Sequence, residues 1–237
     1  ARLDIPVTVE ACDVQALARE LKTGLEDAAR KARYDFFEKV AGRIKAHKIA
    51  VGHTADDNVE TFLMRLLRGA GLKGLCGITP RRGKIIRPLI QNWRKEIEEY
   101  VGALKLVPRR DYTNYESKYL RNRVRMKLIP QLRLYNLNIK EIILQTILLL
   151  TRDSDYLEKK GEELLEEAIV SRGSSDLNLE TAEIREFDEA VKGRVLRAAI
   201  DRVKGDLTEI TYVHIHEIIK KLEETEGWEL HLPGGIF

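Results

Sequence analysis

The sequence has few cysteines, glycines, prolines and long apolar runs, and each scarcity excludes a class of protein. Two cysteines, Cys12 and Cys76, stand far apart among 237 residues, so they form neither a disulfide framework nor a C-x-x-C zinc or redox pair. Glycine (16) and proline (6) are sparse, which argues against wholesale disorder. The longest apolar run, Ile142–Leu150, is interrupted and too short to cross a bilayer. We therefore expect a cytoplasmic protein that does not enter a membrane.

The net charge is small as well, +3 at pH 7, so the total charge says little about partners. Its distribution says more, because nine basic residues and only two acidic ones, Asp111 and Glu116, lie between positions 105 and 133. This local excess predicts contact with a polyanion, and a solvated surface stretch is the alternative. The basic residues are Lys105, Arg109, Arg110, Lys118, Arg121, Arg123, Arg125, Lys127 and Arg133.

The first half of the chain shows apolar spacing that alternates between strand and helix periods. Strands that alternate with helices are typical of a parallel α/β layer. We therefore predict an α/β fold with an open parallel sheet. The expected strands are residues 5–9, 49–53 and 84–87, and the expected helices are residues 13–21, 25–45, 57–68 and 94–102.

The pattern changes after about residue 130 and becomes helical. We predict a boundary near residues 133–137, with a partial nucleotide-binding α/β domain at 1–133 and a mostly helical domain at 134–237. The segment WELHLPGG, residues 228–235, alternates like the start of a further strand in another domain. The expected helices are residues 139–170, as one helix or two, 189–203 and 213–223.

The stretch GHTADDNVETFLMRLLRGAG, residues 52–71, places a histidine and two aspartates directly before an apolar helix. One interpretation is structural: Asp57 caps the helix, Glu60 completes a variant capping box, and His53 bonds to the backbone. The other is functional, because ligands of an open parallel sheet bind at the carboxyl ends of its strands, where His53, Asp56 and Asp57 would project. A carboxylate there can hold a magnesium ion that bridges nucleotide phosphates, and Glu60 can face a cationic substrate.

This stretch resembles the H-x-x-D-D-x-x-E-T…R-G-x-G-L-x-G-L signature of the tRNA(Ile)-lysidine synthetases, which belong to the PP-loop ATP pyrophosphatases. Three further segments agree in the same order, and the resemblance is collinear over about residues 3–132. It implies a Rossmann-like, adenine nucleotide alpha hydrolase-like fold. The segments are LEDAARKARYDFF (25–37), similar to L-E-x-A-A-R-x-x-R-Y; IIRPLIQNWRKEIEEY (85–100), similar to R-P-L…R-x-E-I-x-x-Y; and DYTNYESKYLRNRVRMKLIPQL (111–132), similar to D-x-[ST]-N…R-N-x-x-R…L-I-P-x-L.

The resemblance also implies an activity: an ATP-dependent ligase that joins lysine to carbon 2 of the wobble cytidine in an isoleucine tRNA. ATP adenylates the carbonyl oxygen at that carbon, and the lysine amine then displaces AMP. The implied cofactors are ATP and magnesium. The implied partners are isoleucine tRNA, contacted in part by the helical domain, lysine, and a second copy of the chain in a homodimer.

The implied roles fall on residues that match the family's motifs. Asp57 would hold magnesium, His53 would lie beside the nucleotide, and Glu60 would bind the lysine ammonium group, so these three are the expected catalytic residues. Arginine suits phosphate because its planar fork binds two oxygens at once. The expected ATP and phosphate ligands are His53, Arg68, Arg87, Arg121 and Arg125, and the expected tRNA contacts are Arg110, Asn114, Arg121, Asn122, Arg123 and Lys127.

Structural interpretations of several of these residues stay open. Arg121 and Arg125 can be an exposed i,i+4 pair on a helix, and Asn114 can simply stabilise a turn. The family's S-G-G-x-D-S loop, whose N–H groups cradle pyrophosphate, is not found in these residues, and neither is its H-x-L-R segment. We therefore expect a piece of a longer protein that is inactive in isolation and prone to aggregate through an unpaired sheet edge.

Three other functions compete with the ligase. A PP-loop tRNA cytidine thiolase would share the fold, the nucleotide and the tRNA, but enzymes of that kind typically use paired cysteines or an iron–sulfur cluster. A non-catalytic RNA-binding module would use only the basic stretch, and its binding would weaken steeply with salt. A generic ATP-binding scaffold leaves the RNRVR segment, residues 121–125, unexplained.

Overall fold

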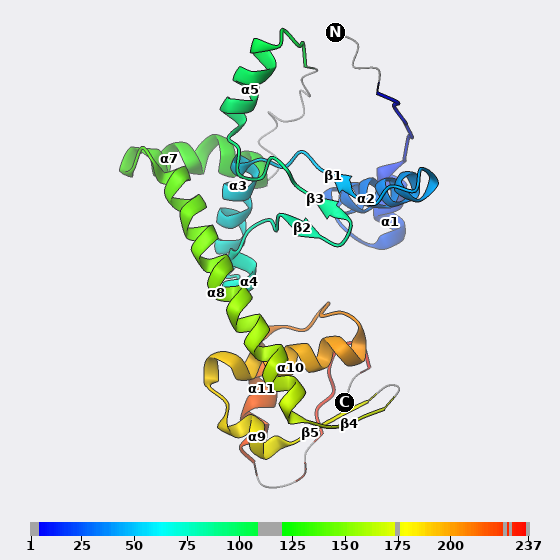
Figure 1. The fold of residues 1–237 in the computed structure, drawn as a ribbon, viewed down its shortest axis with the longest axis vertical. Coiled ribbons are helices and arrows are strands. Elements are labelled where there is room, and N and C mark those ends of the chain that lie inside the picture. The colour runs from blue at the N-terminus through cyan, green and yellow to red at the C-terminus, as the bar shows by residue number, and fades with distance from the viewer. Residues whose placement is uncertain (1–4, 109–119, 174–175, 225–226, 228, 236–237) are drawn as a thin grey trace. The chain divides into compact units, whose positions relative to one another are not determined.

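A computed structural model describes residues 5–108, 120–173, 176–224, 227 and 229–235 of the chain. The chain divides into two compact units, residues 1–147 and 148–237 (Figure 1). The change between them falls within one helix, α8 (Ile139–Ala168). In the described part of the chain, no helix combines the length and the apolar character that a membrane span requires.

The first unit begins with two helices that pack against each other, α1 (Val14–Leu21) and α2 (Leu25–Arg43). Asp13 caps α1, because its carboxylate accepts hydrogen bonds from two free backbone N–H groups of the first turn. The small buried residues Ala28 and Ala41 line the inner face of α2. Both helices confirm the expectation from the apolar spacing.

A small sheet with strand order β1-β3-β2 follows these helices. Strand β1 (Ile49–Ala50) pairs in parallel with β3 (Ile85–Ile86), which confirms a parallel pair in the α/β part. Strand β2 (Arg81–Arg82) was not expected; it pairs antiparallel with β3 through a tight turn in which Gly83 has a φ of 57°. Glycine adopts such a left-handed conformation without a steric penalty.

The strand expected at residues 5–9 is wrong. These residues belong to no strand of the described chain, and Ile5, Val7 and Val9 are 66%, 82% and 86% exposed. Their alternation gives a β preference, but a strand forms only when a neighbouring strand satisfies its backbone groups. In the described part of the chain, the three-stranded sheet contains only β1, β3 and β2, so this segment has no such neighbour.

Helix α3 is the central helix of the first unit, since eight of its twelve residues are buried. It contacts α4 (Figure 1) and a continuous helical segment whose middle part, η2, is widened to a π-helix. Such widened turns are frequent at functional sites. The elements are α3 (Ala55–Leu66), α4 (Leu72–Leu75), α5 (Arg94–Ala103), α6 (Leu120–Arg123), η2 (Val124–Leu128) and α7 (Ile129–Tyr135).

The second unit is mainly helical, as expected, and α8 is a single helix that ends at Ala168. The expected continuation to residue 170 is wrong, because β4 begins at Ile169 and pairs with β5 in an unexpected hairpin. Of the strand expected in residues 228–235, the described residues form only a single β-bridge at Leu232, and Leu230 and Leu232 pack against the helical core. The further elements are β4 (Ile169–Arg172), β5 (Leu177–Leu179), α9 (Thr181–Glu186), α10 (Glu189–Lys204) and α11 (Tyr212–Leu222).

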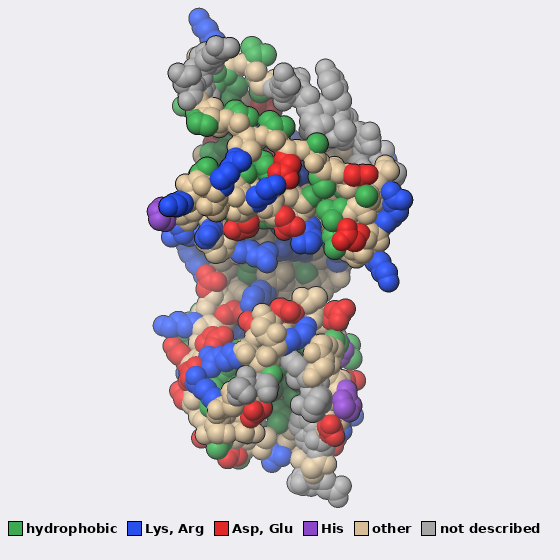
Figure 2. Space-filling model, turned by 90° about the vertical axis from the view of Figure 1, so that its right-hand side faces the viewer, with side chains coloured by type: hydrophobic (Ala, Val, Ile, Leu, Met, Phe, Trp, Pro, Cys, Tyr) green, Lys and Arg blue, Asp and Glu red, His purple; other side chains and the backbone are tan. Residues whose placement is uncertain are grey.

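The surface charges are of both signs. On the face drawn in Figure 2, lysine and arginine side chains are interspersed with aspartate and glutamate over the described residues. This distribution agrees with the net charge of only +3. A site for an anion must therefore come from a local arrangement of side chains and not from a field that covers a whole face.

Candidate functional site

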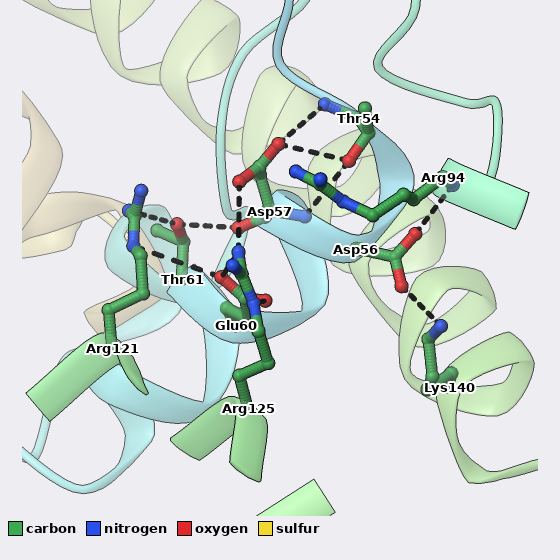
Figure 3. Close-up of polar contacts among 9 residues, drawn as sticks. All are labelled: Thr54, Asp56, Asp57, Glu60, Thr61, Arg94, Arg121, Arg125 and Lys140. Atoms are coloured by element: carbon green, nitrogen blue, oxygen red, sulfur yellow. Dashed lines mark hydrogen bonds and ion pairs between the residues drawn. The ribbon is translucent and has the colours of Figure 1, made fainter. Parts of the chain in front are cut away.

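The N-terminus of helix α3 carries a reciprocal cap between Thr54 and Asp57 (Figure 3). Asp57 Oδ2 accepts hydrogen bonds from the Thr54 backbone N–H and hydroxyl, both at 2.9 Å, and Thr54 Oγ1 accepts from the Asp57 N–H at 3.4 Å. The expectation that Asp57 is the N-cap with Glu60 as its partner is wrong, because the helix begins at Ala55. The T-x-x-D spacing was the overlooked signal for this cap.

The second oxygen of Asp57 is the one available for a ligand. Oδ1 lies 3.8 Å from Arg125 Nη2, and the Asp57 side chain is 13% exposed. Among the described residues, no group of three or more histidine, cysteine, aspartate or glutamate side chains is close enough to hold a metal ion. The position fits magnesium on a nucleotide, because that ion takes one or two carboxylates from the protein and completes its shell with phosphates and water.

Glu60, on the next turn of α3, is buried and accepts two hydrogen bonds from Arg125. Arg125 Nε donates to Oε1 at 2.6 Å and Nη2 donates to Oε2 at 3.0 Å, a bidentate pair, while Glu60 is only 1% exposed. Burial raises the pKa of Glu60 above its usual value, and the bond from Arg125 opposes that rise. The same bond raises the pKa of Arg125 and holds the guanidinium protonated.

Arg121 reaches the same face of α3 from one turn earlier in the helical segment (Figure 3). Its Nε lies 3.9 Å from Glu60 Oε2, and its Nη2 donates to Thr61 Oγ1 at 3.4 Å. Thr61 Oγ1 in turn donates to the Asp57 carbonyl at 2.8 Å. The alternative of an exposed i,i+4 arginine pair is therefore wrong, since Arg121 and Arg125 both turn toward the acidic helix.

The helical segment formed by α6, η2 and α7 is called the basic segment below. It has an inner face toward α3 and an outer face toward solvent, and the expected tRNA contacts divide between these two faces. Asn122 is 7% exposed and lies on the inner side of the segment with the two arginines. Arg123 and Lys127 are exposed on the outer side, where a polyanion can reach them. Arg110 and Asn114 lie outside the described residues.

Asp56 is joined to the start of α8, a connection that the sequence did not indicate. Its Oδ2 accepts from the Arg94 backbone N–H at 2.8 Å, and its Oδ1 accepts from Lys140. Lys140 also lies over the Trp93 ring, 4.6 Å from the centroid. Burial pushes the pKa of Asp56 up, but the bonds from Lys140 and Arg94 outweigh it and hold the pKa below its usual value.

His53 follows strand β1 and directly precedes the cap residue Thr54. Arg87, which follows β3, is 5% exposed and donates from Nε to His53 Nδ1 at 3.2 Å. Burial lowers the pKa of His53; the nearby Asp57 carboxylate opposes that shift and the Arg87 charge reinforces it. The parallel pairing of β1 with β3 thus brings the two residues together, as expected for the carboxyl ends of neighbouring strands.

Arg68 is not brought to this group. It is exposed in the turn that ends α3, whereas Asp57 lies in the first turn of that helix. Arg68 lies eleven positions after Asp57 along helix and turn, which is on the order of 16 Å along the axis. The structure therefore assembles Asp57, Glu60, Arg121 and Arg125 around the first half of α3 and leaves Arg68 at the opposite end.

Comparison with known proteins identifies the class. The profile of the PP-loop domain matches residues 1–132, more than half of the chain, and the chain belongs to this family. That match covers the site on α3 together with Arg121 and Arg125. It confirms the nucleotide-binding class expected from the ordered motifs.

The names of the individual relatives narrow the comparison from the PP-loop class to one kind of protein. The chain is 35% identical to a tRNA(Ile)-lysidine synthase of Caldanaerobacter subterraneus subsp. tengcongensis over 98% of its length and 50% of the relative's. It is 38% identical to proteins of the same name from Clostridioides difficile, over 97% of the chain and 50% of the relative, and from Geobacter sulfurreducens, over 98% and 50%. The chain thus spans about half the length of the curated relatives it matches, and the resemblance read from the motifs is confirmed.

Proposed function

We propose that this chain is part of an ATP-dependent ligase that joins lysine to carbon 2 of the wobble cytidine in an isoleucine tRNA. The observation that carries the proposal is the convergence of Arg121 and Arg125 on Asp57 and Glu60 within a PP-loop domain. A triphosphate needs cations, a lysine needs an anion, and both types of group meet here. The names of the relatives support the same substrates.

The proposal extends to the fold and its surroundings. We infer that β1 and β3 belong to an open parallel, Rossmann-like sheet, with a nucleotide-binding domain over residues 1–133 and a helical, tRNA-contacting domain over 134–237. Arg123 and Lys127 on the outer face of the basic segment suit tRNA phosphates, together with Arg110 and Asn114. A cytoplasmic location and a homodimer fit an enzyme that acts on tRNA.

Asp57 Oδ1 would hold the magnesium ion, whose chemistry is to neutralise the triphosphate and assist the departure of pyrophosphate. The other proposed roles belong to side chains of this chain. Arg121 and Arg125 bind phosphate oxygens through their forks. His53 lies at the end of β1, where a nucleotide of an open sheet is expected. Arg68, at the far end of α3, is proposed only for tRNA phosphate.

Glu60 is the proposed ligand of the lysine ammonium group, and Arg125 occupies both of its oxygens in the structure. The two facts agree if Arg125 turns to the triphosphate when ATP binds and lysine then takes its place. Glu60 stays paired with a cation throughout, which avoids the penalty of an uncompensated buried charge. Lysine should therefore bind the full-length protein at least tenfold more tightly with a non-hydrolysable ATP analogue than without it, as measured by calorimetry.

The activity is tested with full-length protein, an unmodified isoleucine tRNA transcript, ATP, magnesium and lysine. AMP release and the modified cytidine in the digested tRNA are measured together. We expect both products in the wild type and a loss of at least about 100-fold in Asp57→Asn, because the metal contact is gone. Glu99→Gln is the matched control, since Glu99 is an exposed carboxylate on α5. Equal activities of the two variants, or AMP release that needs no lysine, would contradict the proposal.

The same assay separates the alternatives. Cys12 is exposed, Cys76 is buried, and neither is in a disulfide, so these two cysteines do not form the pair that a thiolase typically uses. An iron–sulfur absorbance band with sulfur transfer to tRNA would support that enzyme instead. Salt-sensitive tRNA binding without AMP release would support a non-catalytic RNA-binding protein. ATP turnover that is unaffected by tRNA would support a generic ATP-binding scaffold.

A further inference from the structure

Arg87 is held in place by the chain around it and has little access to solvent. Its side chain and backbone are 5% exposed in total, its Nη1 donates to the Thr79 carbonyl at 2.6 Å, and its backbone N–H donates to the Pro80 carbonyl at 2.9 Å. A phosphate ligand needs its guanidinium fork open to the ligand. The observed contacts direct the fork of Arg87 into the protein.

A further hydrogen bond of this guanidinium fixes the protonation state of a histidine. Arg87 Nε donates to His53 Nδ1 at 3.2 Å. An arginine at neutral pH is always protonated and can only donate, so Nδ1 must accept with its lone pair. The ring is then neutral, its proton sits on Nε2, and Nε2–H is a donor on the side of the ring away from Arg87.

We propose that Arg87 is a positioning residue that holds His53 in the neutral form protonated at Nε2, so that Nε2–H donates to a phosphate oxygen of the bound nucleotide. This inference rests on the proposed function for the identity of the acceptor, and it replaces the direct phosphate contact expected of Arg87. While the Arg87 bond is in place, His53 acts as a hydrogen-bond donor and not as a general base.

The loop at residues 77–80, which holds Arg87, is itself hydrogen-bonded to helix α3. Asn58, 5% exposed, accepts a hydrogen bond from the Ile78 N–H at 2.7 Å, next to the Thr79 carbonyl that anchors Arg87. Gly77 has a φ of +66°, and a Cβ there would lie 2.2 Å from Asn58 Oδ1. The loop thus approaches α3 as closely as glycine allows. Because α3 also carries Asp57, the histidine donor and the proposed metal ligand are fixed to one element.

The charges around His53 favour the same state. Burial lowers its pKa, and the charges of Arg87, Arg121 and Arg30 act in the same direction, against the opposing effect of Asp57. A neutral ring at pH 7 is what the geometry of the Nδ1 acceptor requires. The hydrogen bond from Arg87 defines which ring nitrogen accepts, and the lowered pKa of His53 is consistent with that neutral state.

The test is a side-chain nitrogen spectrum of the full-length protein with ¹⁵N-labelled histidine. The chain has five histidines, and His53→Gln assigns the signal of the one in question. We expect His53 at pH 7 to be protonated at Nε2 with an unprotonated, hydrogen-bonded Nδ1. We expect Arg87→Lys to move the Nδ1 signal, while Arg82→Lys, an exposed arginine on β2, leaves it unchanged. The wild-type spectrum alone decides the state of the ring if a variant fails to fold.

A proton on Nδ1 in the wild type, or a His53 signal that does not respond to Arg87→Lys, would overturn the proposal. Neither result depends on ATP or tRNA, so neither is confused with failure of the proposed function. Addition of a non-hydrolysable ATP analogue should shift the Nε2–H resonance of His53. If the resonance does not shift, the phosphate is not the acceptor. In the ligase assay, Arg87→Lys should lower kcat/KM for ATP about tenfold or more, because the His53 donor to the bound phosphate is no longer held in place.

Discussion

Two arginine–carboxylate clusters in this molecule both contain short contacts but have different surroundings. In the first unit, Arg125 binds Glu60 at 2.6 and 3.0 Å, and the Glu60 side chain is 2% exposed. In the second unit, Arg202 on α10 lies 2.6 Å from both Glu162 and Glu166 on α8, whose side chains are 55% and 50% exposed. Burial raises the pKa of Glu60, whereas the bond from Arg202 lowers the pKa of Glu166.

The difference shows why a short ion pair is not by itself a sign of function. The pair on α8 and α10 is solvated, so each partner regains water when the other is removed. In the pair on α3, the Glu60 side chain is shielded from solvent. Removal of one partner therefore leaves a buried charge uncompensated. The buried charge of Glu60 beside Asp57 is therefore better explained by a functional role at the site than by a contribution to stability.

The largest expected effect is that of Glu60→Gln. The variant leaves Arg125 without its anion in a half-buried position, and we expect the free energy of unfolding to fall by roughly 3 kcal/mol. Urea unfolding of the purified proteins measures this. Arg125→Gln should destabilise as well, because it leaves the more deeply buried Glu60 unpaired. A Glu60→Gln protein as stable as wild type would show that the carboxylate is not charged in the folded state.

A smaller effect is expected for the cap of α3. Thr54→Ala removes a reciprocal cap at a residue that is 6% exposed, and we expect a loss of about 1 kcal/mol. Thr54→Ser keeps the hydroxyl and should lose much less. Thr211→Ala at the exposed cap of α11 is the matched comparison, because that cap also has a reciprocal partner, His214. Identical losses at the two caps would contradict the greater role assigned to the buried one.

The pH dependence of stability should contain a contribution from His53. Its pKa is lower in the folded state than the ordinary value of 6.5, so the unfolded chain takes up a proton first as the pH falls through that value. Stability is therefore lost on acidification and levels off once the pH passes the folded-state pKa. Unfolding midpoints at pH 7.5 and 5.5 should differ less in His53→Gln than in wild type. Arg82→Lys, at an exposed arginine on β2, should leave the difference unchanged.

The smallest effect is expected for Glu166→Gln. Its folded-state pKa is lowered, so its contribution is present above the unfolded-state pKa and is lost as the pH falls through the folded-state value. Since half of the side chain is exposed to solvent, the urea midpoint at pH 7 should move only slightly, and the shift should vanish in high salt. A shift as large as that of Glu60→Gln would remove the contrast between the two clusters.

Local patterns predicted the longer helices but not α4, α9 or the helical segment at residues 120–135. Non-local pairing explains what the sequence left out in the strands and the site. Helices α1, α2, α10 and α11 follow from apolar spacing, because a helix satisfies its own backbone. The segment at residues 5–9 has the composition of a strand, but its structure depends on a partner. The motifs identified Glu60 and Arg125 separately, and only the fold shows that they bind each other. Lys140 carries no motif, so its contact with Asp56 had no signal in the sequence.

The central claim is that the acidic helix α3 and the basic segment form one coupled site. A double-mutant cycle with Glu60→Gln, Arg125→Gln and the double variant measures that coupling directly from three unfolding free energies and the wild type. We predict a coupling energy of about 2 kcal/mol or more, with the double variant more stable than the sum of the single losses implies. A coupling energy near zero would contradict the account, because the two residues would then act independently.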